Sequence, residues 1–238
     1  MPSPYSRRIP ECATGATRFF LPAFLTVLAA SCGLEPRDPD PMRFADAIER
    51  FDLVDQNAEY VANPIVFVGS SSIGGWDLTE YFPEIPVLNR GFGGSQISDV
   101  NHFLDRVLLK YEPSIVVFYA GENDIHAGKS PERVATDFAA FVDRVHTELP
   151  ETDIIFLPMK PSPSRIHLWP EMKEGNEIIR GMCDASERLT YLDIASPMLT
   201  SPGRARPELF VEDSLHMNPS GYALWSELLR WELQRLRD

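Results

Sequence analysis

The chain has 238 residues, enough for one α/β domain with a substantial hydrophobic core. Its formal net charge of -13 argues against a nucleic-acid partner, because phosphates would be repelled. Of its three cysteines, only Cys183 lies in the part expected to fold, so no intrachain disulfide is expected there.

The first 31 residues have the layout of an export signal. Arginines precede an apolar run that is too short to span a bilayer. Small residues then lead into Cys32, which resembles a bacterial lipobox. We therefore expect a signal peptide over 1–31, lipid on Cys32 and a tether over 32–41. Because Ala29 stands where that motif usually has leucine, ordinary secretion with cleavage near this residue is the alternative.

This reading predicts an exported protein that is lipid-anchored in a bacterial envelope, facing the periplasm or in the outer membrane. The lipid anchor would be its only membrane contact. A soluble periplasmic or secreted protein is the alternative.

From residue 42 onward, strand and helix patterns alternate without repeats. Apolar runs stopped by turn residues predict five strands, at 65–69, 86–89, 114–119, 153–157 and 190–194. Apolar residues at every third or fourth position predict five helices, at 42–62, 97–111, 131–149, about 170–188 and 219–236. The alternation predicts one domain, 42–238, folded as a three-layer α/β/α sandwich around a mostly parallel five-stranded sheet.

A serine cluster follows the first strand. Ser71 lies at the carboxyl end of a buried parallel strand, where sites form in open α/β sheets. Serines after strands are more often helix caps or turn formers than nucleophiles. A nucleophilic serine needs a base, and His216 can serve, with Asp213 three residues earlier holding the other ring nitrogen. Alone, an Asp and a His at this spacing equally fit a surface ion pair.

An acyl-transfer site also needs donors for its oxyanion. The backbone N–H groups of Ser71 and Gly94 and the side-chain amide of Asn123 can supply three. Gly94 and Asn123 follow the second and third strands, although each alone fits an ordinary turn. No metal or cofactor is expected, since the candidate site offers one histidine and no cysteine. Three aromatic residues are candidates to line an acyl pocket or stack on a sugar: Trp76, Phe92 and Trp169.

Together these motifs resemble the SGNH (GDSL-type) hydrolase superfamily, over roughly residues 62–236. The four blocks that carry the resemblance are Gly-Ser-Ser-Ser at 69–72, Asn-Arg-Gly-Phe-Gly-Gly at 89–94, Gly-Glu-Asn-Asp at 121–124 and Asp-Ser-Leu-His at 213–216. Ser70 stands where the family name has Asp, a residue that is not the triad acid. The arrangement is similar to the group around the platelet-activating-factor acetylhydrolase catalytic subunits.

The resemblance implies a flavodoxin-like SGNH hydrolase fold and ester hydrolysis through an acyl-enzyme. It implies that Ser71 attacks, His216 is the base, Asp213 orients the imidazole, and Ser71, Gly94 and Asn123 hold the oxyanion. The implied partner is a small acyl or acetyl ester. Carbohydrate O-acetyl esters, lysophospholipids and thioesters stay open as substrates. A non-catalytic binding lipoprotein is the alternative of another class, and the complete residue set argues against it.

Overall fold

The computed structural model describes residues 35–237, so the expected signal peptide and Cys32 lie outside the described residues. Its main sheet has five parallel strands in the order β2-β1-β3-β4-β5. A separate antiparallel hairpin is formed by β6 and β7. The strands are β1 (Ile65–Gly69), β2 (Val87–Gly91), β3 (Ile115–Tyr119), β4 (Asp153–Phe156), β5 (Leu189–Tyr191), β6 (Leu199–Ser201) and β7 (Arg204–Ala205).

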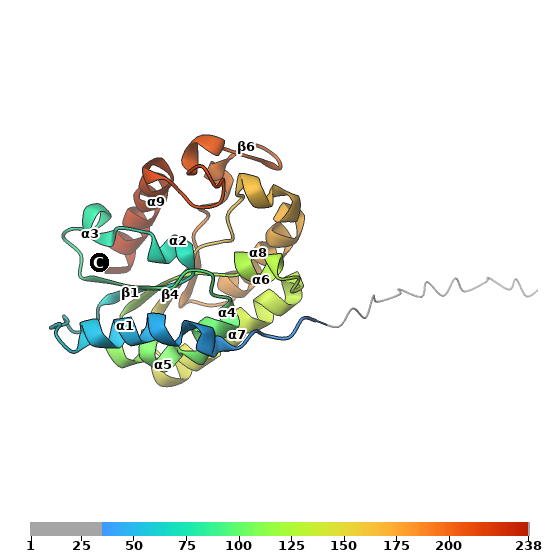
Figure 1. Cartoon of the computed structure of the whole chain (residues 1–238). Coiled ribbons are helices and arrows are strands. Elements are labelled where there is room, and N and C mark those ends of the chain that lie inside the picture. Colours follow the sequence, from blue (N-terminus) through green and yellow to red (C-terminus); the bar gives the residue numbers. More distant parts are fainter. Residues whose placement is uncertain (1–34, 238) are drawn as a thin grey trace, which may run out of the picture. The chain divides into compact units, whose positions relative to one another are not determined.

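Helices cover both faces of the main sheet (Figure 1). The α-helices are α1 (Ala45–Asp55), α2 (Ser71–Gly74), α3 (Leu78–Tyr81), α4 (Ile97–His102), α5 (Leu104–Val107), α6 (Glu122–His126), α7 (Pro131–Glu148), α8 (Trp169–Asp184) and α9 (Pro219–Arg237). The 3-10 turns are η1 (Pro41–Phe44), η2 (Leu109–Tyr111), η3 (Pro163–Leu168), η4 (Ser196–Met198) and η5 (Pro207–Leu209). The predicted three-layer α/β/α sandwich with a parallel sheet is therefore confirmed.

Two hydrophobic cores form because side chains alternate along each strand. On one face, Val68 and Phe118 pack under α1, α4, α5, α7 and α8. On the other face, Phe67 and Tyr119 pack under α2 and α9, with Trp225 at the centre. Both faces are buried, which explains why β1 and β3 are continuous apolar runs and do not alternate with polar residues.

Two predicted helices differ from the observed ones. The region 97–111 is broken into α4, α5 and η2, and the break at Leu108 lets Leu109 reach the core. In a continuous helix, each residue turns by about 100°, so Leu109 would face away from the stripe that contains Leu104 and Leu108. The first helix ends at Asp55, because the chain folds back there and the Tyr60 hydroxyl donates a hydrogen bond to the Asp55 carboxylate.

The described end of the predicted tether lies against the domain. Asp38 forms ion pairs with Lys129 (2.8 Å) and Arg133 (2.5 Å), and the Glu35 carboxylate accepts the Ser130 backbone N–H (3.2 Å). Among residues 35–237, no helix is long and apolar enough to cross a membrane.

Candidate active site

The serine turn is fixed by the close approach of β1 to β3. Gly69 has a φ of 140°, and a Cβ at this position would lie 1.9 Å from the Tyr119 carbonyl oxygen. Glycine is therefore required where β1 ends. Ser70 stays extended, and its backbone N–H donates to the same Tyr119 oxygen (2.9 Å). Ser71 then becomes the first residue of α2, at the carboxyl edge of the sheet.

Ser71, His216 and Asp213 form one chain of hydrogen-bonding groups. The His216 Nε2 atom lies 3.2 Å from Ser71 Oγ, and its Nδ1 atom lies 2.6 Å from Asp213 Oδ2. The bond to the His216 side chain, together with the backbone N–H groups of His216 and Leu215, lowers the pKa of Asp213 to about 2. An ionised Asp213 requires the hydrogen on Nδ1, so Nε2 can accept the Ser71 hydroxyl proton.

The glycine turn after β2 lies directly beside the serine. A Cβ on Gly93 would lie 3.6 Å from Ser71 Cβ, and a Cβ on Gly91 would lie 2.3 Å from the Gly74 backbone nitrogen. The Phe92 N–H donates to the Gly69 carbonyl (2.9 Å), which joins the two turns. The backbone thus comes close to Ser71 with no side chain between them.

Asn123 is held at the start of α6 by two hydrogen bonds. Its Oδ1 atom accepts from Arg165 Nη1 (3.0 Å), and its Nδ2 atom donates to the Ser95 carbonyl (3.0 Å). Ser95 follows Gly94 in the chain, so this bond ties the two predicted oxyanion donors to each other. Gly94 itself has a φ of 84°, a conformation that favours glycine.

The structure separates the three aromatic candidates. Phe92 is 3% exposed and belongs to the core under α1, but it lines a groove of about 610 Å³ together with Ser71 and the facing side of α1. Trp169 lines a different hollow, of about 720 Å³, against the β6–β7 hairpin. Trp76 lies in the core, 2% exposed, and its indole N–H donates to Ser226 Oγ (3.0 Å). The expected substrate role of Trp76 is therefore corrected: its ring packs in the aromatic core beside α9.

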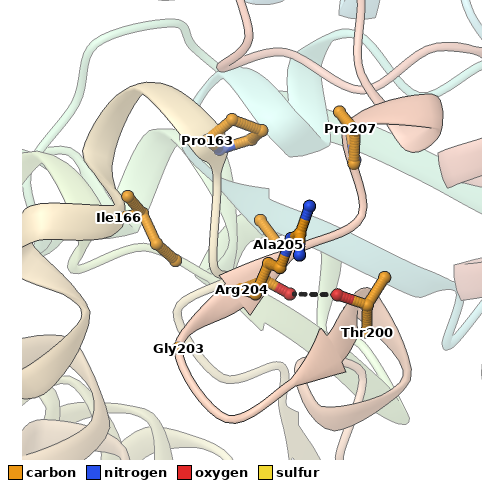
Figure 2. Close-up of a pocket in the computed structure, with 7 residues that line it drawn as sticks. All are labelled: Pro163, Ile166, Thr200, Gly203, Arg204, Ala205 and Pro207. Carbon is orange, nitrogen blue, oxygen red and sulfur yellow. Dashed lines mark hydrogen bonds between the residues drawn. The ribbon is translucent and has the colours of Figure 1, made fainter.

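An apolar cleft of about 550 Å³ lies between η3 and the β6–β7 hairpin (Figure 2). Pro163 and Ile166 form one wall, and Ala205 and the hairpin form the other. A hydrogen bond from the Thr200 hydroxyl to the Arg204 carbonyl (3.2 Å) closes the hairpin. The η3 turn also connects to the histidine loop, where the Ser164 N–H donates to the Ser214 carbonyl (3.0 Å).

A buried charged network behind Asn123 was missed by the sequence analysis. The Glu122 carboxylate accepts hydrogen bonds from Lys160 Nζ (2.6 Å), the Tyr119 hydroxyl (2.7 Å) and Ser162 Oγ (3.1 Å). Burial raises the pKa of Glu122, but the charge and hydrogen bond of Lys160, the Tyr119 hydrogen bond and the charge of Arg165 together hold that pKa below its usual value. The only signal in the sequence was that Glu122 directly precedes Asn123.

Asp124, the residue after Asn123, is also buried. It accepts the Ile97 backbone N–H (3.2 Å) and pairs with Lys129 Nζ (3.0 Å). Burial raises the pKa of Asp124 to about 6. Both acidic residues of this block therefore fix the loop from inside the protein. Within residues 35–237, no group of three or more metal-ligating side chains comes together.

Solved structures with the same fold come from several bacteria. They include a Streptococcus pneumonia protein with the provisional name of platelet activating factor (TM-score 0.72, 20% identity, covering 79% of this chain and 92% of that one). A GDSL-like lipase from Bacteroides thetaiotaomicron has a TM-score of 0.68 and 16% identity, covering 79% and 97%. An acetylxylan esterase from Geobacillus stearothermophilus, solved as a catalytic mutant, has a TM-score of 0.58 and 13% identity, covering 73% and 95%.

Family membership rests on the sequence match. No curated protein matches the chain. The model of the GDSL-like lipase/acylhydrolase family matches residues 68–224, a span that includes all four predicted blocks from the serine turn to the histidine loop. The chain therefore belongs to the GDSL-like lipase/acylhydrolase family and is an SGNH-type ester hydrolase.

Proposed function

We propose that the protein is a serine esterase that cleaves a carboxylic ester through an acyl-enzyme intermediate. The observation that carries the proposal is the hydrogen-bonded chain from Ser71 through His216 to Asp213. Ser71 Oγ attacks the acyl carbonyl while His216 Nε2 takes its proton, and the imidazolium then protonates the leaving alcohol. His216 next activates a water molecule, which releases the acid and restores the serine. Asp213 orients the imidazole throughout.

The negative oxygen of each tetrahedral intermediate is held by three N–H donors in this proposal. They are the backbone amides of Ser71 and Gly94 and the side-chain amide of Asn123. Support comes from their arrangement: Gly93 lies against Ser71, and the Asn123 amide is bonded to the carbonyl of Ser95, next to Gly94. Donors fixed before the reaction stabilise charge as it develops without reorganising.

A carbohydrate O-acetyl ester is the substrate class that the groove favours. The groove beside Ser71 has a floor of glycines and a wall on α1 with polar and aromatic side chains, including Asp46, Arg50 and Phe51. The sugar part of such an ester offers hydroxyls to the polar groups and a ring face to an aromatic side chain. Hydrolysis rates for acetylated xylo-oligosaccharides, a lysophospholipid and a thioester would separate the three substrate classes.

The test of the proposed chemistry is covalent labelling with a fluorophosphonate probe. We expect one probe per chain, attached at Ser71, and loss of labelling in Ser71→Ala. His216→Ala, which removes the base, should also slow labelling. A wild-type protein that folds but never reacts with the probe or with any ester would favour the non-catalytic binding lipoprotein.

We also propose that the protein is exported and held at a membrane surface by lipid on Cys32. The sequence pattern around this cysteine supports the proposal. Cys32→Ser should move the protein to the soluble exported fraction and leave its esterase activity unchanged. Mass spectrometry that finds an unmodified N-terminus beginning before Cys32 would instead indicate a soluble secreted or periplasmic enzyme.

A further inference from the structure

We propose that Arg165 is a positioning residue for the oxyanion site, acting through the side-chain amide of Asn123. This inference rests on the proposed esterase function and adds a residue outside the four family blocks. Arg165 lies in η3, more than forty positions after Asn123, and its Nη1 atom lies 3.0 Å from Asn123 Oδ1. Its side chain is 13% exposed.

The first contribution of Arg165 is to fix which way the amide faces. A guanidinium can only donate hydrogen bonds, so Arg165 must face the oxygen of the Asn123 amide. The Ser95 carbonyl can only accept, so it must face the nitrogen. The two contacts select one of the two amide orientations. Among the described residues, the second hydrogen on Nδ2 has no protein acceptor, so it is available for the substrate oxyanion.

The second contribution is electrostatic. Arg165 Nη1 also lies 3.5 Å from Glu122 Oε1, and Glu122 is paired with Lys160 (2.6 Å). The cations Lys160 and Arg165 and the carboxylate of Glu122 leave a charge of +1 in this network. That charge lies next to the side-chain carbonyl of Asn123. A cation bonded to that carbonyl draws electrons from the amide and makes its N–H a stronger donor. In a buried surrounding, this charge acts more strongly than it would in water.

Arg165 is held in place by the contacts of the η3 turn to which it belongs. The Arg165 backbone N–H donates to Ser162 (3.1 Å), whose hydroxyl binds the same Glu122 carboxylate. Arg165 lies between Pro163 and Ile166 in the chain, and these two residues form one wall of the apolar cleft (Figure 2). The guanidinium is thus carried by a turn that is anchored to the core and to the histidine loop.

The test compares three substitutions of Arg165 with Arg188→Met as the matched control. Arg188 has similar ion pairs, with Glu151 and Asp153, but precedes β5 at the opposite edge of the sheet from the site. We expect Arg165→Met to lower kcat by about 10- to 100-fold with KM changed less than about 2-fold, because the lost interaction strengthens in the transition state. Arg165→Lys should be more active than Arg165→Gln, since it keeps the charge.

A double substitution asks whether Arg165 works through Asn123. Once Asn123 is alanine, adding Arg165→Met should slow kcat by less than about 2-fold, because the group that Arg165 orients is gone. Fully multiplicative losses would overturn the inference, as would an Arg165→Met variant as fast as wild type. If Arg165→Met does not fold, equal activity of Arg165→Lys and Arg165→Gln would overturn it. A wild-type protein without esterase activity would overturn the proposed function, and this inference with it.

Discussion

The two halves of the candidate site differ in their contact with solvent. On one side, the His216 and Asp213 side chains are 43% and 48% exposed. On the other side, the Lys160 and Glu122 side chains behind Asn123 are 2% and 4% exposed. In the proposed mechanism the exposed half contains His216, which would gain and lose a proton, whereas Lys160 and Glu122 would keep their charges. Under the proposed mechanism, burial would follow function: fixed charges gain strength from a dry surrounding, and a base that changes its charge is left in water.

The largest expected effect is on activity, and it comes from the nucleophile beside the exposed half of the site. Ser71→Ala should lower kcat by at least ~10³-fold while the protein folds normally, because the serine, histidine and aspartate act as a unit. Ser70→Ala is the matched control, since Ser70 is 3% exposed and only its backbone is bonded to Tyr119. Ester hydrolysis and circular dichroism of both variants check this. A dead Ser70→Ala with an active Ser71→Ala would move the nucleophile by one residue.

The buried half should respond most in stability. Lys160→Met leaves the buried Glu122 carboxylate without the nearer of its two cations, since only Arg165 (3.5 Å) remains. Removal of one partner of a buried pair typically costs about 3–5 kcal/mol. Arg144→Met, which loses an exposed pair with Glu148, is the control and should cost at most about 1 kcal/mol. Urea unfolding measures both. A Lys160→Met variant with wild-type stability would mean that the buried ion pair contributes no more to folding than an exposed one.

Asn123→Ala tests where the two halves meet. We expect kcat to fall by about 10²–10³-fold with little change in KM, because the amide binds charge that exists mainly in the transition state. Steady-state kinetics on a soluble ester give both constants. A change confined to KM would make Asn123 a substrate-positioning residue and would separate the buried network from the chemistry.

The smallest expected effect is the acid stability that Asp213 supplies. Because its pKa is lowered to about 2, ionised Asp213 stabilises the fold above the ordinary aspartate pKa of about 3.9, and this contribution is lost as the pH falls toward 2. Solvent screens the exposed pair, so we expect less than about 1 kcal/mol. Unfolding of wild type and Asp213→Asn at pH 5 and pH 2.5 measures the difference. A larger loss of stability on acidification in Asp213→Asn than in wild type would reverse the sign.

The sheet could be predicted because its signals are local. Each of β1, β3 and β4 is an apolar run that begins and ends within one residue of the predicted strand. The strand ends also predicted which loops would meet, since parallel strands bring their carboxyl ends to one edge. Gly93 accordingly lies against Ser71, and the Asn123 amide bonds to the Ser95 carbonyl, next to Gly94.

The network behind Asn123 could not be predicted, because its members share no local pattern. Lys160 and Arg165 fall in a proline-rich segment without periodicity, and only tertiary packing brings them to Glu122 and Asn123. Trp76 was misplaced for a related reason: an aromatic residue near a motif can face the substrate or the core, and the sequence does not show which. The β6–β7 hairpin is not among the predicted strands, because strands of three and two residues are too short to give a recognisable pattern.

The hydrogen bond from the Ser70 N–H to the Tyr119 carbonyl has a consequence for how the enzyme would lose activity. It joins the turn that carries Ser71 to the strand end that leads to Asn123, in the middle of the sheet. Amides in such a position exchange with deuterium mainly when the whole domain opens. The distance between Ser71 and Asn123 should therefore stay the same until global unfolding. The exposed loop that carries His216, in contrast, can open locally and reclose. Early heat inactivation would then be reversible, and permanent loss would begin only when the sheet itself melts.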